Sequence, residues 1–575
     1  MTGADPVRLL ELRVLDGPNL YFTRPAIKLT LALPGWMELP ERRAVALGER
    51  VGLVAVRRPA GRPGPPGTEH RRRFLARVAA QVTRQLARAA GVRLAVRARP
   101  GDGPDRVVVA FPWRRRALAE ALGREVADLL GSLLRPGRRL DAAVRAHATR
   151  LEGIDPGPTP AVPVPEVPVV AVTGTNGKTT TVRLLAHVLA SAGLRVAYTS
   201  TDGVYVDGRL VEEGDYSGPA GAAMALSQES VEAVILEVAR GGILLKGIGT
   251  AHNDVAVVTN VSADHLDLQG IRTLDQLAEV KATITRITRP EGWAVLNADD
   301  PRVLAMRRVA TGRPFLFSMD PDHPAIRSAL QDGGLAMAPL DRELALFTPG
   351  PAIHPLLPLE EVPATLAGIS SHHVQNVLAA AAAAIGLGVD RGDLAEGLRS
   401  FVLDPERNPG RGNLFELDGR VVVVDYAHNE AGMAGLVEIA RGLLPTGGRV
   451  WLAFGSAGDR TDQILHGLGY VAARGADRVV VAELHRYLRG RQPEDVVRRL
   501  VDGARDGGAR DVPVVPDELH ALGWMFEASA PGDVVAVNAL GQRPEILAEL
   551  RRRGARRVGP ARCRQLVRRA RRGVR

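Results

Sequence analysis

The stretch Val169-Val170-Ala171-Val172-Thr173-Gly174-Thr175-Asn176-Gly177-Lys178-Thr179-Thr180 decides the fold of this chain. A β-branched run leads into glycines, a lysine and hydroxyls, and an apolar helical pattern follows as far as Gly193. Strand, glycine loop and helix make a phosphate cradle, because backbone N–H groups and the helix N-terminus face the anion. Lys178 adds a positive charge, and the hydroxyl of Thr179 can ligate Mg²⁺. Val172 stands at the first glycine position of GxxxxGK[ST], so the match is partial, and we predict an ATP site.

The 575 residues are enough for three or four domains of the α/β class. No run of eighteen apolar residues occurs, so we expect no membrane span. The start of the chain lacks the pattern of a signal peptide. Cys563 is the only cysteine, which excludes an internal disulfide and fits a cytoplasmic protein.

The formal charge of +11 is concentrated at the C-terminus. Residues 551–575 contain twelve arginines and no acid, so the other 550 residues carry a formal charge of −1. We therefore expect an Arg-rich tail at 551–575 on a nearly neutral body. Such a tail can bind RNA, a polyanionic product or an acidic partner. We favour the simpler interpretation, a solvated terminal helix.

Lysine is rare in this chain: only Lys28, Lys178, Lys246 and Lys281 occur among 75 basic residues. Where arginine is the usual cation, a retained lysine indicates chemistry that a guanidinium cannot perform. Lys281 lies on a helical pattern over 274–287 and could point back toward the phosphate loop. Two roles for Lys281 stay open: an ordinary ion pair, or carbamylation, which would make the side chain an anionic ligand near a metal.

The N-terminal residues 1–154 are predicted to form a small α/β domain. Strand-like segments near 7–14 and 27–33 accompany helical patterns at 71–90 and 113–134, without a metal cluster or nucleophile. We assign this region to docking or oligomerisation. Six prolines between 156 and 168 then predict a stiff linker at 155–168.

From 169 to 405, apolar runs alternate with helical patterns, as in a parallel sheet with helices on both faces. One run ends at Glu237, where a carboxylate is well placed to hold Mg²⁺. Another leads into Asn260, Asp264 and His265. A lone histidine is more often structural, but this one is clustered beside a nucleotide loop and favours a metal ligand. Asn297 ends a further run and can pair with an adenine edge.

Residues 406–550 repeat the alternation and predict a second, Rossmann-like domain. Its first strand ends in Asp425-Tyr426-Ala427-His428-Asn429, and its second in Gly455-Ser456-Ala457-Gly458-Asp459-Arg460. Polar groups at successive strand ends define one binding edge.

With these motifs in order, the chain resembles the Mur ligase family over about 161–550, and within it the Mur-like module of cyanophycin synthetases. The motifs are GTNGKTT, LEVARGG, NVSADHL, LNADDP, DYAHN and GSAGDR. Leu15-Asp16-Gly17-Pro18-Asn19 also resembles the N-terminal domain of that branch. The resemblance implies an ATP-dependent, ADP-forming amide ligase that acts through an acyl phosphate.

The resemblance also implies roles for the matched residues. Lys178, His265 and Lys281 would be catalytic, with Lys281 carbamylated. Thr179 and Glu237 would hold one Mg²⁺, and His265 a second metal. The nucleotide would contact Gly174, Thr175, Asn176, Gly177, Lys178, Thr179 and Thr180 through its phosphates, Asn297 and Asn376 through adenine, and Arg411 and Asp425 through phosphate and ribose.

Two departures from the family are visible. Cyanophycin synthetases carry an ATP-grasp module where the proline linker stands here, so we expect this chain not to make a two-residue repeat alone. A separately encoded ATP-grasp ligase is then a candidate partner. Glu430 replaces the proline of DYAHNP, and His373 the asparagine of an HN pair.

Several functions stay open. The first is a ligase that adds an amino acid, with arginine implied by the branch, to a carboxylate of an acidic peptide or polymer. A glutamate-adding ligase of the folylpolyglutamate type, a non-catalytic ATP-binding scaffold and an RNA-stimulated ATPase are the alternatives. We expect a homo-oligomer without membrane or nucleic-acid partners.

Overall fold

The computed structural model describes residues 5–53, 61–135, 139–264, 266, 268–350, 352–485 and 488–572. They divide into two compact units. The first runs to Pro165 and also takes in 218–223 and 240–251, and the second holds the other described residues. The sequence predicts both of these segments within the central domain at 169–405.

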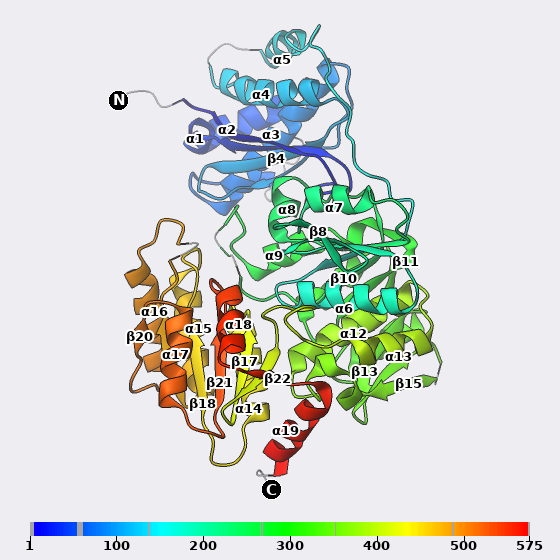
Figure 1. Cartoon of the computed structure of the whole chain (residues 1–575). Coiled ribbons are helices and arrows are strands. Elements are labelled where there is room, and N and C mark those ends of the chain that lie inside the picture. Colours follow the sequence, from blue (N-terminus) through cyan, green and yellow to red (C-terminus); the bar gives the residue numbers. More distant parts are fainter. Residues whose placement is uncertain are drawn as a thin grey trace. The chain divides into compact units, whose positions relative to one another are not determined.

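The first unit contains a four-stranded antiparallel sheet with strand order β1-β2-β4-β3, on which α3 and α4 pack (Figure 1). Its core is built around Trp36, Phe74 and Phe111, all of which are fully buried. The elements are β1 (Arg8–Leu15), β2 (Ala26–Ala32), α1 (Pro34–Met37), α2 (Glu41–Arg50), α3 (Glu69–Ala89), β3 (Arg97–Pro100), β4 (Arg106–Pro112), α4 (Arg116–Ser132), α5 (Leu140–Thr149), the start of α7 (Pro219–Leu226) and α8 (Arg240–Leu245).

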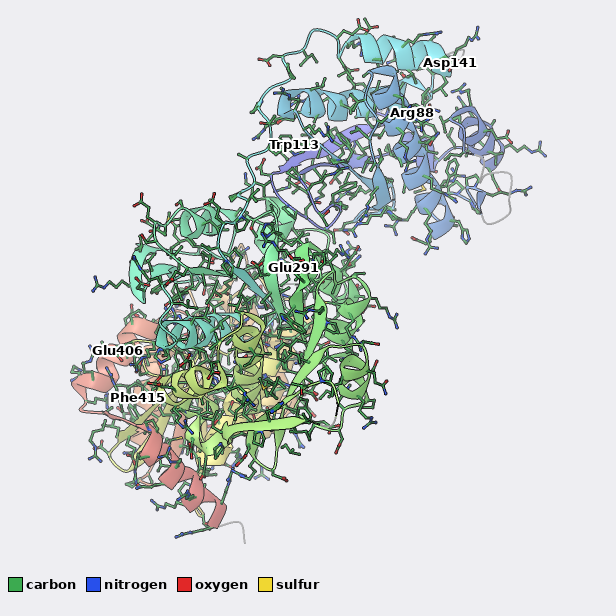
Figure 2. All side chains as sticks on the ribbon, turned by 90° about the vertical axis from the view of Figure 1, so that its right-hand side faces the viewer. Arg88, Trp113, Asp141, Glu291, Glu406 and Phe415 are labelled. Carbon is green, nitrogen blue, oxygen red and sulfur yellow. The ribbon has the colours of Figure 1, made fainter. Side chains whose placement is uncertain are left out.

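Two distant segments of this unit interlock through their backbones. The N–H of Gly17 donates to the carbonyl of Lys246 at 3.3 Å, and the N–H of Ile248 donates to the carbonyl of Pro18 at 2.6 Å. A Cβ on Gly17 would lie 1.8 Å from the carbonyl oxygen of Ile248, and one on Gly247 would lie 2.6 Å from that of Gly17. Glycine is therefore required on both sides of this contact. Trp113, labelled in Figure 2, holds the end of β1 in place, because its indole N–H donates to the carbonyl of Leu15 at 3.2 Å.

The second unit begins with an eleven-stranded sheet of order β15-β14-β13-β12-β11-β10-β5-β9-β6-β7-β8. The strands from β13 to β6 are parallel, and antiparallel strands complete both edges. α6 and α12 pack side by side, and the alanine run of α12 is completely buried. These observations confirm the predicted parallel sheet. The elements are β5 (Val169–Thr173), α6 (Lys178–Ser191), β6 (Val196–Thr199), β7 (Gly203–Val206), β8 (Arg209–Glu213), β9 (Ala233–Glu237), β10 (Asn253–Val258), α9 (Leu274–Lys281), β11 (Thr288–Asn297), α10 (Pro301–Ala305), β12 (Arg313–Phe317), α11 (Pro324–Gln331), β13 (Leu335–Leu340), β14 (Glu343–Phe347), β15 (Ile353–Pro358), α12 (Ser371–Gly386) and α13 (Arg391–Ser400).

A seven-stranded sheet of order β20-β19-β18-β21-β17-β16-β22 forms the C-terminal part of the same unit. Its strands from β20 to β17 are parallel, as predicted for a Rossmann-like domain, and β16 and β22 add an antiparallel edge. The elements are β16 (Asn413–Leu417), β17 (Arg420–Asp425), α14 (Glu430–Leu443), β18 (Val450–Phe454), α15 (Asp462–Gly475), β19 (Arg478–Ala482), α16 (Pro493–Asp506), β20 (Val514–Val515), α17 (Glu518–Ala528), β21 (Val534–Asn538), α18 (Arg543–Arg552), β22 (Arg556–Arg557) and α19 (Pro560–Arg572).

The Arg-rich C-terminus forms the expected terminal helix, α19, but this helix packs one face against the rest of its unit and is not solvated all round. Helix α19 buries one face that includes Leu566 and Val567. Arg562 pairs with Glu416 of β16 at 2.7 Å, and Arg568 approaches Glu360 at 3.3 Å. The amphipathic spacing of apolar residues between the arginines explains this packing. Among the described residues, no helix has both the length and the apolar character needed to cross a membrane.

Candidate active site at the phosphate loop

The phosphate loop joins β5 to α6, as the opening stretch predicts. Gly174 and Gly177 have φ of 155° and 87°. A Cβ at these positions would lie 1.8 Å from Thr259 Oγ1 and 2.1 Å from Asn376 Oδ1, respectively. No side chain caps the N-terminus of α6, so its first N–H groups stay available to a phosphate. Both glycines are therefore needed to bring backbone donors close to an anion.

Neighbouring loops hold this one in shape. The N–H of Asn176 donates to Asn260 Oδ1 at 2.9 Å, and Thr259 Oγ1 donates to the carbonyl of Asn176 at 2.6 Å. Lys178 Nζ folds over the loop and donates to the carbonyl of Thr175 at 3.0 Å. The loop after β10 thus fixes the cradle before any ligand arrives.

Thr179 and Glu237, the two predicted Mg²⁺ ligands, are in direct contact. Thr179 Oγ1 donates to Glu237 Oε2 at 2.9 Å, and the glutamate is 2% exposed. Burial raises the pKa of Glu237, and the charges of Lys178 and Arg411 partly oppose this rise. Glu237 Oε1 is buried and has no hydrogen-bond partner among the described residues. An orphaned carboxylate oxygen beside a hydroxyl suits a hard cation, so these two residues fit Mg²⁺.

His265, the predicted second metal ligand, lies outside the described residues. Within the described ranges, no group of three or more His, Cys, Asp or Glu side chains is arranged to hold a metal.

Lys281 is the last residue of α9, so the helix ends earlier than the predicted 274–287. A 3₁₀ turn at Thr285–Ile287 and then β11 replace its last turns, where β-branched residues disfavour an α-helix. Lys281 is 3% exposed, and its Nζ donates to the carbonyl of Gly174 at 2.6 Å. The side chain therefore points back toward the phosphate loop. A free ammonium or a carbamate N–H can make this bond.

The two predicted adenine contacts touch different parts of the loop network. Asn297 is buried; its Nδ2 donates to the carbonyl of Thr259 at 2.8 Å, and its Oδ1 accepts from the N–H of Asp299 at 3.0 Å. Asn376 projects from α12 against Gly177. Near it, burial and the neighbouring His372 lower the pKa of His373 to about 3. Burial therefore favours the neutral form of that histidine.

Arg411 and Asp425 come from the C-terminal domain to the same place. Arg411 Nη2 lies 3.5 Å from Thr179 Oγ1, and its guanidinium lies 5.2 Å from the ring centre of Tyr426. Asp425 Oδ2 accepts from the N–H of Gly412 at 2.8 Å. Burial raises the pKa of Asp425 to about 6, against the opposing effects of that N–H and of Arg411. The central and C-terminal domains therefore both contribute residues to the candidate site.

Sequence reasoning missed contacts between residues far apart in the chain. Asn429 exchanges side-chain hydrogen bonds with Asn176, and Arg460 pairs with Asp264 at 3.3 Å. Asp202 forms ion pairs with three arginines, namely Arg183, Arg411 and Arg543. The DYAHN and GSAGDR motifs contain Asn429 and Arg460, so their position at strand ends was the available signal.

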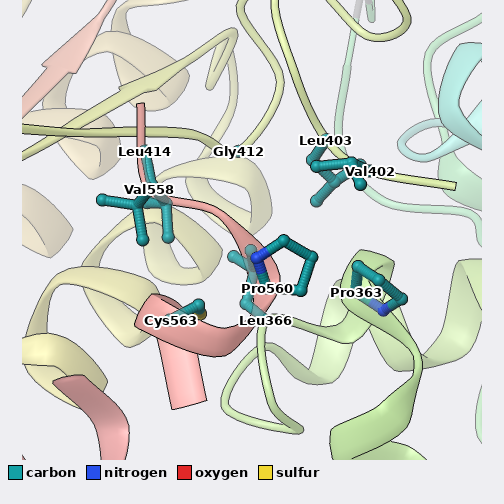
Figure 3. Close-up of a pocket in the computed structure, with 9 residues that line it drawn as sticks. All are labelled: Pro363, Leu366, Val402, Leu403, Gly412, Leu414, Val558, Pro560 and Cys563. Atoms are coloured by element: carbon teal, nitrogen blue, oxygen red, sulfur yellow. The ribbon is translucent and has the colours of Figure 1, made fainter. Parts of the chain in front are cut away.

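A small apolar hollow lies where α19 meets loops of the central and C-terminal domains, and Gly412, whose N–H donates to Asp425, is part of its wall (Figure 3). Cys563 is one of its walls, and burial raises the pKa of this thiol to about 11. The lining residues are Pro363, Leu366, Val402, Leu403, Gly412, Leu414, Val558, Pro560 and Cys563. The hollow is a packing feature of the domain junction.

Comparison with known proteins agrees with this geometry. Residues 172–384 match the family model of the Mur ligase middle domain, and residues 410–541 that of the Mur ligase glutamate ligase domain. A cyanophycin synthetase of Crocosphaera subtropica is 40% identical over 379 residues, which are 64% of this chain and 42% of that protein. A UDP-N-acetylmuramyl-tripeptide synthetase of Deinococcus radiodurans is 31% identical over 67% of this chain and 74% of its own length.

The chain spans less than half the length of the cyanophycin synthetases that it matches. Among solved structures, E. coli FolC in complex with ADP matches with a TM-score of 0.50 and 21% identity, over 68% of this chain and 91% of that one. This likeness concerns the fold alone.

Proposed function

The chain belongs to the Mur ligase family, and we propose that it is an ATP-dependent ligase that joins an amino acid to a carboxylate through an acyl phosphate. The observation that supports this most directly is the convergence of Lys178, Thr179 and Glu237 with Arg411 of the other domain. A purely structural loop would not need a buried carboxylate with an orphaned oxygen.

In the proposed reaction, an oxygen of the substrate carboxylate attacks the γ-phosphorus of ATP and ADP leaves. The amine of the second substrate then attacks the acyl carbon, loses a proton and displaces phosphate. Lys178 and Arg411 stabilise the negative charge that develops on the transferring phosphoryl group. Mg²⁺ held by Thr179 and Glu237 would supply further charge neutralisation. The loop N–H groups hold the phosphates in line, and closure of the C-terminal domain keeps water from the acyl phosphate.

The remaining site assignments belong to this proposal. Asn297 and Asn376 would contact adenine, and Asp425 the ribose. His265 would hold a second metal, supported by a carbamylated Lys281. The contact of Lys281 with the phosphate loop supports a role close to the nucleotide.

The similarity to cyanophycin synthetases supports an acidic peptide or polymer as the acceptor and arginine as the amine. The N-terminal unit would serve docking or homo-oligomerisation in the cytoplasm. A separate ATP-grasp ligase would supply any second residue of a repeat. A glutamate-adding ligase of the folylpolyglutamate type is a weaker alternative, because FolC matches this chain in fold at 21% identity, whereas a cyanophycin synthetase matches it at 40% identity.

ADP release from a panel of acidic peptides, each paired with single amino acids, tests the proposal. We expect one pair to stimulate ATP consumption and Lys178→Ala to abolish it. ATP binding without stimulation by any pair would instead favour a non-catalytic scaffold.

A further inference from the structure

The outer edge of β1 in the N-terminal unit has no neighbouring strand. In the sheet order β1-β2-β4-β3, β1 stands at one end and pairs with β2 alone. Across the part of the chain that the structure describes, the backbone of Arg8–Val14 makes no hydrogen bond outside this pairing. The strand has eight residues and no proline, although short length and proline are two usual ways of protecting an edge. This edge is therefore able to accept another strand.

Apolar side chains along β1 are incompletely covered. Leu9, Leu12 and Val14 face the core of the unit, yet all three are only partly buried. Leu10, at the bulge between Leu9 and Glu11, is 43% exposed. Their cross-strand partners on β2 are fully buried: Leu31, Leu29 and Ile27. A strand added beside β1 would remove this remaining apolar surface from water, which favours association.

The charges on the other face of β1 are unbalanced. Arg13 stands directly opposite Lys28 of β2, where two like charges repel each other. Both cations use Glu11: Arg13 Nε donates to its Oε1 at 2.8 Å, and Lys28 Nζ donates to its Oε2 at 2.9 Å. No other acidic side chain among the described residues forms an ion pair with either cation. A second carboxylate on the outer side of Arg13 would therefore be favourable.

A second copy of the chain supplies that carboxylate in one register. If two β1 strands pair antiparallel about a twofold axis at Leu12, Glu11 of each copy lies opposite Arg13 of the other. An axis at Glu11 or at Arg13 would instead place two identical charges opposite each other. A shift by one residue would put core-facing side chains on the polar face. The axis at Leu12 also places the exposed Leu10 opposite Val14.

We propose that two copies of this chain pair through β1, antiparallel about Leu12, and join their four-stranded sheets into one sheet of eight strands. Arg13 directs its Nε and Nη2 toward Glu11 of its own chain. A guanidinium has five N–H donors, so others are left for Glu11 of the second copy. The pairing concerns the N-terminal unit alone and does not depend on the ligase function proposed above.

The first test is the mass of the full chain in solution, measured by sedimentation velocity over a concentration series. We expect a dimer, with twice the 61.3 kDa of one chain. Arg13→Glu should raise the dimer Kd roughly 10- to 100-fold, because both cross-strand pairs become repulsive. The new glutamate faces Lys28, so the Tm should stay nearly constant. Arg145→Glu, an equal charge change on α5, is the matched control and should leave the Kd unchanged.

Exchanging the two charges separates pairing from mere loss of the arginine. The double variant Glu11→Arg/Arg13→Glu keeps opposite charges facing each other across the axis, so it should recover the dimer. A wild type that is monomeric at every concentration would refute self-pairing and leave the edge to a strand of another protein. A dimer with the wild-type Kd in Arg13→Glu, or no recovery in the double variant at constant Tm, would also overturn the proposal.

A disulfide cross-link tests the register directly. Leu12→Cys places two thiols opposite each other on the axis, at a Cα separation that a disulfide accepts. Leu9→Cys lies on the same face of the same strand, but its copy would be about 20 Å away, six residues along the paired strands. The native Cys563 is buried. Mild oxidation should yield a covalent dimer of Leu12→Cys only, and equal cross-linking of both variants would refute the register.

Discussion

Asn176 in the phosphate loop and Asn429 ahead of α14 exchange two side-chain hydrogen bonds, of 3.1 and 2.9 Å. One residue belongs to the central domain and the other to the C-terminal domain. Asn429 is 1% exposed, and its Oδ1 also caps α14 by accepting from the N–H of Gly432 at 2.9 Å. The conformation of the loop is thereby tied to the position of the C-terminal domain.

The substitution Asn429→Asp removes the hydrogen bond from Asn429 to Asn176 and keeps the cap of α14. The carboxylate can still cap α14, but it cannot donate to Asn176 Oδ1. We expect kcat/KM for ATP to fall roughly tenfold, as for one lost hydrogen bond with added repulsion, at nearly constant Tm. Asp390→Ala, which removes the N-cap of α13, should lower stability by about 1 kcal/mol and leave kcat/KM alone. Wild-type ADP release in Asn429→Asp would show that the pair is dispensable.

Magnesium should stabilise the folded chain through Glu237. Because burial raises the pKa of this carboxyl, its ionised form opposes folding as the pH rises through the raised pKa in the absence of metal. Mg²⁺ should therefore raise the Tm of the wild type near pH 8, but not that of Glu237→Gln. The variant should lose roughly 100-fold in kcat. The exposed Glu229→Gln serves as the control, and a Mg²⁺ response retained in Glu237→Gln would exclude this glutamate as the ligand.

Asp425 should make stability depend on pH. Its folded pKa of about 6 lies above its ordinary value of 3.8, so its contribution is complete below 3.8 and is lost as the pH rises through 6. Asp425→Asn should accordingly be more stable than the wild type at pH 7, by about 1 to 3 kcal/mol, and equal to it near pH 4. Denaturant unfolding at both pH values measures the difference. A variant that is less stable than the wild type at pH 7 would contradict this assignment.

Lys281 can be tested for carbamylation by chemical rescue. Lys281→Ala should lose most ligase activity, because it removes both the contact with Gly174 and the proposed anionic group. Acetate should restore part of the ADP release if the native group is a carbamate. Rescue by methylamine in place of acetate would show that the free ammonium is the active form.

Because the C-terminus is folded, the hypothesis of an RNA-stimulated ATPase cannot be tested by truncation. Deleting 551–575 would remove the end of α18 and all of β22 and α19, so a surface substitution is needed instead. Leu566→Ala should destabilise the chain by about 2 to 4 kcal/mol, because the side chain is buried. The exposed Arg569→Gln should leave stability unchanged, and RNA should alter ATP turnover in neither that variant nor the wild type. Stimulation by RNA that Arg569→Gln weakens would revive the nucleic-acid hypothesis.

Local pattern was sufficient for β5, β9 and the phosphate loop, because neighbouring residues determine each of them, but it did not predict the antiparallel strands at the sheet edges. The β-branched run before Gly174 and the hydroxyls after it lie within one supersecondary unit. The three contacts that complete the site join residues much farther apart: Asn176 with Asn429, Thr179 with Arg411, and Asp202 with Arg543 are separated by 253, 232 and 341 positions. No periodicity encodes such pairs. The early end of α9 was missed for another reason, since its apolar spacing continues into β11.

The interlocked glycines of the N-terminal unit have a consequence for protein engineering. Gly17 fits closely against the backbone of Ile248, and Gly247 against that of Gly17, although 230 positions separate the two glycines in the sequence. A chimera that replaces residues 1–165 with the corresponding part of another Mur ligase would remove the residues against which 240–251 pack. Grafts should therefore transfer 218–223 and 240–251 together with the N-terminal residues, as one module made of three pieces of chain.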